Sequence, residues 1–205
     1  ASVLHPTDFS NESSVAFAHA LRIALDACGE IHLFRVGKAE GEKAGWFPSV
    51  RDTLHAWKIL PENATREEVG LLGLVVRKTH ARGEDPVAGI TRHLTKHPAD
   101  LIVMATHQRH GLKKLFSKEV AQPIARSTHS KVLFVPVGHE GFISKDKGEV
   151  HLKRVLLPVD RSECAKVAYQ AVLGLIKSLK LESVTVFALH VGDATGMPTI
   201  ETIPP

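Results

Sequence analysis

The chain has 205 residues, with 26 lysines and arginines against 22 aspartates and glutamates, and a formal net charge of +4 at pH 7. Its 43% hydrophobic and 23% charged residues are typical of a globular protein, and no apolar run approaches the roughly 18 residues of a membrane span. The spread of the basic residues and an aromatic content of only 5% argue against nucleic-acid binding. Two distant cysteines and the lack of a signal-peptide pattern indicate a cytoplasmic protein.

The first part of the chain predicts a strand, a helix and a second strand. The segment SVLHPTD forms a strand that ends at Pro6, and Ser10 begins a helix that Gly29 stops. Apolar residues recur on one face of this helix, at Ala18, Leu21, Leu25 and Cys28. IHLFRV (31–36) follows as the second strand, and such a βαβ unit implies parallel pairing.

Residues 38–66 are less regular but contain two helix starts. A helix follows Ser49 with Val50, Leu54 and Trp57 on one face, and Thr65 with Glu68 forms a capping box. A third strand lies within residues 71–81.

Alternation of strands and helices continues to residue 137. Asp85 caps a helix whose first residue is Pro86, whose inward residues are Val87, Ile90 and Leu94, and which Pro98 ends. The later elements are a strand at 101–106, a helix capped by Ser117 and a strand at 131–137. The fold class is therefore α/β, with a doubly wound, five-stranded parallel sheet.

Part of this pattern occurs twice. VLHPTDFS (3–10) and VLLPVDRS (155–162) agree at five of eight positions, and FRVGKAEG (34–41) parallels LHVGDATG (189–196). We expect a complete domain at 1–138, a linker at 139–153 and a partial second copy at 154–205. Since two strands and a helix bury little apolar surface, either the natural chain is longer or the second copy completes itself against the first domain or another chain.

Four motifs in order resemble those of the universal stress protein family. They are PTDFS (6–10), DPVAGI (85–90), ADLIVMATH (99–107) and VAQPIARSTHSKVLFVP (120–136). The resemblance covers residues 1–138 apart from 38–66, and residues 153–196 look like the opening half of a second domain, as in tandem members. It implies the strand order 3-2-1-4-5 of the adenine nucleotide alpha hydrolase-like fold.

Nucleotide-binding members of that family carry a glycine-rich phosphate loop after the fourth strand. Three glycines and a serine or threonine, separated by two, nine and no residues, would fall at Ala105, Gln108, Lys118 and Glu119, and none of the four matches. Gly111 is an additional glycine of the loop. Gln108 adds a side chain where backbone should approach phosphate, and Glu119 places a carboxylate in the first turn of a helix. The loop is therefore expected to have lost phosphate binding.

Two further positions keep the opposite interpretation open. The resemblance places Asp8 at the adenosine part of a nucleotide and Val36 in the adenine pocket. The loop also carries the basic residues Arg109, Lys113, Lys114 and Lys118, of which Lys118 could pair with Glu119 or reach a phosphate. The structural alternatives are that Asp8 caps a turn, Val36 belongs to the core and the basic residues form a solvated face. ATP or AMP with magnesium, bound by the altered loop or in the absent half of the second copy, remains the alternative.

No catalytic or metal site is predicted. His93 and His97 lie four residues apart on a helix, and His107 and His110 could meet His5 near the strand ends, but neither group has an evident further ligand. Cys28 has no clear histidine partner, so we see no nucleophilic triad.

The resemblance implies a stress-response protein that acts through protein contacts, without a cofactor and without enzymatic activity beyond a weak ATPase. Its protein partners are unknown, and nucleic acid and membrane are not expected partners. In the family's strand order the fifth strand is a sheet edge at which members dimerise. The apolar segment VLFVPV (132–137) therefore predicts a homodimer.

Overall fold

The computed structural model describes residues 1–10, 13–37, 47–83, 85–106, 123–126, 130–159 and 164–191. The chain forms two compact units, Ala1–His151 and Leu152–Pro205. No helix within the described residues is long and apolar enough to cross a membrane.

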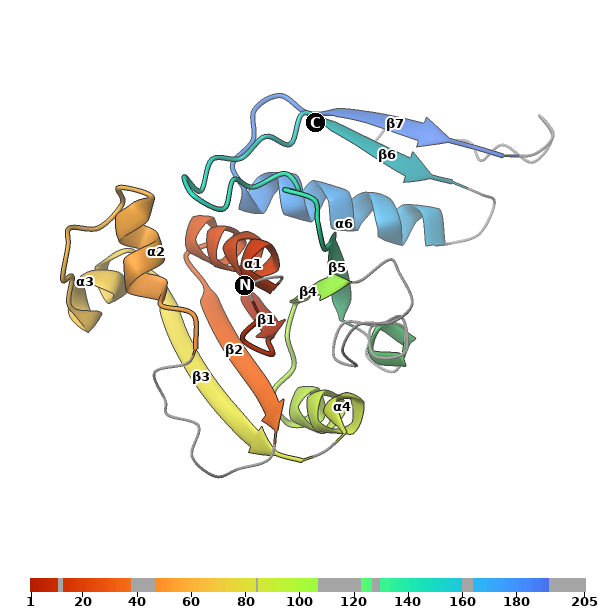
Figure 1. The fold of residues 1–205 in the computed structure, drawn as a ribbon. Helices are drawn as coiled ribbons and strands as arrows, with labels where there is room; N and C mark the ends of the chain where they lie inside the picture. Colours follow the sequence, from red (N-terminus) through yellow and green to blue (C-terminus); the bar gives the residue numbers. More distant parts are fainter. Residues whose placement is uncertain are drawn as a thin grey trace. The chain divides into compact units, whose positions relative to one another are not determined.

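The first unit contains a five-stranded sheet (Figure 1). Its strands are β1 (Ser2–Pro6), β2 (Glu30–Gly37), β3 (Val75–Arg82), β4 (Leu101–Thr106) and β5 (Lys131–Pro136). Every pairing is parallel, and the order is β3-β2-β1-β4-β5. The predicted fold class and strand order are confirmed.

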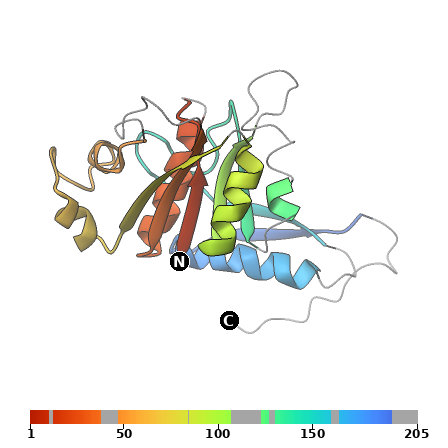
Figure 2. The same ribbon diagram turned by 90° about the horizontal axis from the view of Figure 1, so that it is seen from below.

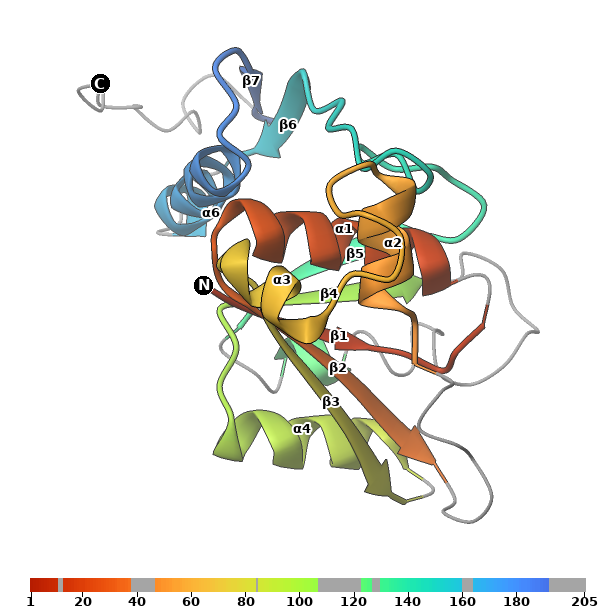
Figure 3. The same cartoon turned by 90° about the vertical axis from the view of Figure 1, so that its left-hand side faces the viewer.

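Helices lie on both faces of this sheet. They are α1 (Ser14–Asp26), α2 (Val50–Ala56), α3 (Arg66–Leu71) and α4 (Pro86–Lys96). Figures 2 and 3 show α1 on one face and α4 on the other, so the sheet is covered on both sides. This is the doubly wound arrangement, which leaves the carboxyl ends of the strands as the usual place for a ligand.

The local signals at three helix starts are confirmed. The Ser49 side chain accepts from the backbone N–H of Asp52, and Thr65 and Glu68 form the reciprocal capping box. Asp85 accepts hydrogen bonds from two backbone N–H groups of α4, with Pro86 at the first position of that helix. The predicted helix after Ser117 lies outside the described residues.

The first helix begins four residues later than predicted. The Ser10 N–H donates to Asp8 Oδ1 at 2.8 Å, and the Ser10 carbonyl accepts from Ser13 N at 3.1 Å, so Ser10 lies in a turn. The helix starts at Ser14 and ends at Asp26, before Gly29. Serine and aspartate stabilise turns as readily as helix caps, which explains the misplaced start.

A buried cluster fills the space between the sheet and α4. Its members are Leu4, Phe34, Val36, Ile90, Leu94, Ile102, Met104 and Ile124, and the partly buried Val87 and Val132 pack against it. The predicted inward positions of α4 are confirmed. Each fully buried side chain of this size contributes about 1.5–3 kcal/mol to stability.

The described residues 139–151, which belong to the predicted linker, are part of the first unit. The indole N–H of Trp57 donates to the Lys145 carbonyl at 2.9 Å. Gly148 has a φ of +67°, and a Cβ there would overlap the Trp57 ring. Ile143 is fully buried. This segment is thus packed onto α1 and the region after α2.

The second unit contains β6 (Arg154–Pro158), α6 (Cys164–Ser178) and β7 (Thr185–Leu189), with β6 and β7 paired in parallel. Its register repeats that of β1 and β2: Leu156 lies beside Phe187 as Leu4 lies beside His32, and Pro158 beside Leu189 as Pro6 beside Phe34. The Val159 N–H donates to the Leu189 carbonyl, as Thr7 N–H does to Phe34, at 2.9 Å in both places.

Candidate functional site

Three of the predicted nucleotide-site residues meet at the carboxyl edge of the sheet. Val36 is near the end of β2, Asp8 follows β1, and Ala105 is near the end of β4. These strands are neighbours and parallel, so their carboxyl ends share one edge. The other predicted positions, Gln108, Arg109, Gly111, Lys118 and Glu119, lie outside the described residues.

The side chains at this edge are engaged with the protein itself. The Asp8 carboxylate accepts from Ser10 N–H, as the turn-capping alternative requires. Val36 is only 6% exposed and belongs to the α4 cluster. A Cβ on Gly89 would lie 2.6 Å from Val36 Cγ2, so the backbone of α4 approaches this valine closely. Ala105 is 1% exposed. Of the three, only Asp8 is placed to offer a polar group to a ligand.

His5 is buried next to this edge. Its Nδ1 lies 2.9 Å from the Val103 carbonyl, and its ring is tilted against Phe17. Burial lowers the pKa of His5 from 6.5 to about 4, although the Val103 carbonyl and the Asp8 charge act in the opposite direction. The ring is therefore neutral at pH 7, with Nδ1–H as the donor to the carbonyl. His107 and His110, the suggested companions of His5, lie outside the described residues.

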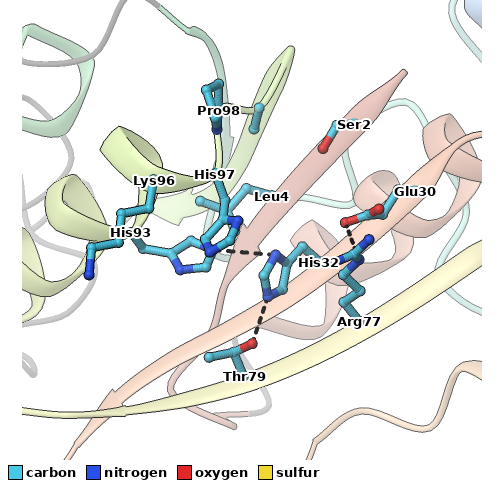
Figure 4. Close-up of a pocket in the computed structure, with 11 residues that line it drawn as sticks. Ser2, Leu4, Glu30, His32, Arg77, Thr79, His93, Lys96, His97 and Pro98 are labelled. Atoms are coloured by element: carbon cyan, nitrogen blue, oxygen red, sulfur yellow. Dashed lines mark hydrogen bonds and ion pairs between the residues drawn. The ribbon is translucent and has the colours of Figure 1, made fainter.

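A pocket of about 430 Å³ lies at the other end of the same strands (Figure 4). It is formed by the amino-terminal parts of β1, β2 and β3 and by the last turn of α4. Its polar lining includes Ser2, Glu30, His32, Arg77, Thr79, His93, Lys96 and His97. The i, i+4 spacing singles out His93 and His97 in the sequence, whereas His32 lies within an apolar strand and no local pattern marks it.

Three histidines form the centre of this pocket. His93 Nε2 lies 3.3 Å from His32 Nδ1, and His32 Nε2 lies 2.9 Å from the Thr79 hydroxyl, as the dashed lines in Figure 4 show. The His93 ring also stacks on Phe34 with 4.2 Å between centroids. His97 follows one turn later, with 4.9 Å between its ring and that of His93. The cluster therefore ties α4 to β2 and β3.

His32 and His93 are poor bases. Burial, and then the charges that His32 and His97 carry when protonated, lowers the pKa of His93 from 6.5 to about 4. Burial also lowers the pKa of His32, with smaller contributions from His97 and Arg77. Arg77 itself pairs with Glu30, with 3.0 Å from Nε to Oε1. At pH 7 His32 and His93 are thus neutral and share one hydrogen bond, which makes them a structural link between elements.

Within the described residues, no group of three or more histidine, cysteine, aspartate or glutamate side chains is placed to hold a metal ion. The pocket therefore offers hydrogen-bonding groups and the exposed cations of its rim. The carboxyl edge and this pocket lie at opposite ends of the strands, so they are separate sites.

Comparison with known proteins relates the first unit to one family. The model of the Universal stress protein family matches residues 2–136. No curated protein matches the chain.

Solved structures of universal stress proteins are similar to this chain, and the first of those that follow supports the same fold. One from Archaeoglobus fulgidus DSM 4304 is 21% identical, with a TM-score of 0.51 over 95% of this chain and 68% of its own. Another from Archaeoglobus fulgidus, in complex with dAMP, is 16% identical, with a TM-score of 0.40 over 65% of this chain and 95% of its own. UspA from Lactobacillus plantarum is 18% identical, with a TM-score of 0.40 over 65% of this chain and 96% of its own.

Proposed function

The chain belongs to the universal stress protein family, and we propose that it acts in the cytoplasmic stress response through protein contacts, without ordinary ATP binding in its first domain. The proposal rests on one observation: the two residues that would contact an adenosine, Val36 and Asp8, are already engaged with the protein itself. Val36 is buried beneath Gly89 of α4, and the Asp8 carboxylate holds the turn at Ser10. A nucleotide would have to displace these contacts before it gained its own.

The sequence of the loop after β4 supports the same proposal. Gln108, Lys118 and Glu119 stand where a phosphate loop has two glycines and a small hydroxyl residue. A carboxylate at the third of these positions carries the same sign of charge as a phosphate and would repel it. We therefore propose that the first domain uses no cofactor and that any ATPase activity is weak. The alternative to this proposal is that the protein binds ATP or AMP with magnesium, at the altered loop or in the remainder of the second copy.

Titration calorimetry with ATP and magnesium distinguishes these alternatives. For the natural chain we expect a dissociation constant weaker than about 1 mM, equivalent to about −4 kcal/mol. The combined variant Gln108→Gly, Lys118→Gly, Glu119→Ser should bind more tightly, because it removes bulk and the repelling carboxylate. Leu112→Gly, a change in the same loop outside the four motif positions and outside its basic residues, should leave binding unchanged. Micromolar binding by the natural chain would overturn the proposal.

The second unit is, we propose, the opening part of a second copy of the domain. The repeated segments of the sequence fall on β1 and β6 and at the ends of β2 and β7, and the two strand pairs have the same register. The matching hydrogen bonds beyond the strands support the same relation. A site in the remainder of such a copy is the second place where a nucleotide could bind.

The edge strand β5 is the surface proposed for pairing between two chains. It lies at the end of the sheet, and Phe134 on it is 39% exposed. Lys131 precedes this apolar run and Pro136 ends it, so little charge opposes the approach of a second edge. A two-fold pair would bury Phe134 twice and extend the sheet across the interface.

Sedimentation of the natural chain at micromolar concentration is expected to show a homodimer, and Phe134→Lys should give a monomer that remains folded. Val132 is less suitable for this test than the sequence suggested, because it packs against the α4 cluster and a lysine there would disturb the core. Leu71→Lys, at an 86% exposed position on α3, is the matched control and should remain dimeric. A monomeric natural chain would contradict the proposed pairing.

A further inference from the structure

The histidine pocket at the amino ends of β1, β2 and β3 gathers cations and hydrogen-bonding groups that the proposed function does not use (Figure 4). Arg77 comes from β3 and Lys96 from the last turn of α4, and His32, His93 and His97 line the same pocket. Its volume of about 430 Å³ lies within the range of about 300–1,000 Å³ that small-molecule pockets have. The pocket therefore has room for a small ligand and a polar lining to hold it.

The carboxylates at this pocket are already engaged. Among the described residues Glu30 is the one carboxylate that lines it, and Glu30 is paired with Arg77 at 3.0 Å. Asp100 lies nearby but outside the lining, and its Oδ2 accepts the Ser2 N–H at 2.8 Å. Lys96 is exposed, and no carboxylate in the described part of the chain pairs with it. A ligand with negative charge would find this ammonium group available.

The charge of the pocket depends on its histidines. The carbonyl end of α4, beside Lys96, contributes about half a negative elementary charge. While the rings are neutral, Arg77 and Lys96 therefore exceed Glu30 and the helix end by only about half a charge. One proton on a histidine brings this excess to about one and a half charges. Protonation is thus the step that makes the pocket attractive to an anion.

The His32–His93 pair can take up one proton and keep its contacts. In one of its neutral forms His93 Nε2–H donates to His32 Nδ1 at 3.3 Å, and His32 Nε2–H donates to the Thr79 hydroxyl at 2.9 Å. A proton added to His93 Nδ1 leaves both hydrogen bonds in place and makes the first charge-assisted. Burial, and then the charges of His32 and His97, oppose this proton and lower the pKa of His93 to about 4. An anion beside the rings acts in the opposite direction.

We propose that the histidine pocket binds an oxyanion of the phosphate type, as a free ion or a monoester, and takes up a proton with it. Lys96, Arg77 and the protonated His93 supply the positive charge, so binding tightens as the pH falls. The pocket and the carboxyl edge lie at opposite ends of the strands, so this ligand is additional to the proposed function and independent of it.

Calorimetric titration of the full chain with sulfate at constant ionic strength tests the proposal. Sulfate keeps its two charges across the pH range used, whereas a phosphate monoester changes its charge near pH 6. We expect a dissociation constant of about 1 mM at pH 5.5 and at least tenfold weaker binding at pH 7.5, since uptake of one proton changes affinity by up to about tenfold per pH unit. Titrations in two buffers of different ionisation enthalpy should show net proton uptake.

Single substitutions locate the site. Lys96→Gln, at an exposed position, should weaken sulfate binding at pH 5.5 at least fivefold, and His93→Gln should remove most of the dependence on pH. Arg92→Gln is the matched control, because it removes the same charge from the same helix at an exposed position outside the pocket, and it should leave binding unchanged. If His93→Gln unfolds, Lys96→Gln and the proton uptake of the natural chain remain decisive.

Inorganic phosphate and glycerol 3-phosphate distinguish the two sources of the anion. Tighter binding of the ester would assign the pocket to a monoester, and equal or tighter binding of inorganic phosphate would assign it to the free ion. Either result keeps the site.

Three outcomes would overturn the inference. They are absence of sulfate binding at pH 5.5, equal affinity at both pH values, and equal weakening by Lys96→Gln and Arg92→Gln, which would show a general attraction of anions to a basic chain. Gln108→Gly, Lys118→Gly, Glu119→Ser should leave sulfate binding unchanged. Failure of the anion site is therefore distinguishable from failure of the proposed function, which the ATP titration decides.

Discussion

Replacement of His19 by leucine is expected to lower the free energy of unfolding of the first unit by about 3 kcal/mol. His19 is fully buried on α1. Its Nε2 accepts hydrogen bonds from the backbone N–H groups of Phe142 and Ile143, at 3.1 and 3.2 Å. The proton is therefore on Nδ1, which donates to the Val15 carbonyl at 2.8 Å. Leucine fills the volume but leaves one buried and one part-buried donor without this acceptor, and a buried donor without a partner costs about 1–3 kcal/mol.

Urea unfolding at pH 7 measures this loss, and hydrogen exchange locates it. The amides of Phe142 and Ile143 should exchange faster in His19→Leu, because their acceptor is gone. His151→Leu is a suitable control, since its side chain is exposed and only pairs with Glu149, and we expect a change within about 0.5 kcal/mol. A loss below about 1 kcal/mol with unchanged exchange at both amides would show that His19 does not hold the segment.

The same contact shows why composition misleads about the predicted linker. Residues 139–153 are rich in glycine and charge, and a flexible connection is the natural interpretation of such a run. The described part is held by His19, whose ring accepts hydrogen bonds from two backbone N–H groups that lie 123 and 124 residues later in the chain. A buried histidine on α1 reads in the sequence as an ordinary polar residue of a helix. Its role depends on a pairing of distant segments that no local pattern contains.

The elements that were predicted well are those set by local chemistry. The capping box of Thr65 and Glu68, and Asp85 with Pro86 before α4, each need only neighbouring residues. The strand order needed more, since periodicity fixes the elements without their arrangement, and it came from the family resemblance. The start of α1 was predicted wrongly because Ser10 and Asp8 form a local hydrogen bond in a turn.

The candidate site was predictable only in part, for the same reason. The carboxyl edge followed from the rule for parallel sheets, and Asp8, Val36 and Ala105 do lie there. The histidine pocket combines His93 on α4 with His32 on β2, which are 61 residues apart. The sequence supplied the helical pair of histidines, but the ring that His93 contacts comes from a strand. Only the packing of α4 across the start of β2 brings the two together.

Acid is expected to destabilise the first unit between pH 6.5 and pH 4, and buried histidines are the cause. Burial lowers the pKa of His5 from 6.5 to about 4, and it also lowers the pKa of His19, His32 and His93. In this range the unfolded chain binds protons at these rings and the folded chain does not. The contribution of these neutral histidines to the free energy of unfolding is therefore fully present above pH 6.5 and is lost as the pH falls towards 4.

His5→Leu isolates one part of this effect. Leu157 stands at the matching place of β6, so leucine fits a strand of this kind, and His5 Nε2 is buried without a hydrogen-bond partner among the described residues. At pH 7 we expect a change within about 1 kcal/mol, since the lost bond to Val103 and the removed orphan nitrogen act in opposite directions. At pH 4.5 the variant should be the more stable protein by about 2–3 kcal/mol, because a shift of one pKa unit corresponds to about 1.4 kcal/mol.

Urea unfolding of both proteins between pH 4.5 and pH 7.5 provides the comparison. Aspartates and glutamates titrate in the same range but are common to both chains, so the difference between the two curves reports His5 alone. His139→Leu, at an exposed position after β5, should follow the natural chain at every pH. Parallel curves for His5→Leu and the natural chain would mean that His5 takes up its proton in the folded state as readily as in the unfolded one. The acid sensitivity of this domain would then have to come from His19 or from the His32–His93 link between β2 and α4. In the second case His93→Gln would be the variant that flattens the curve.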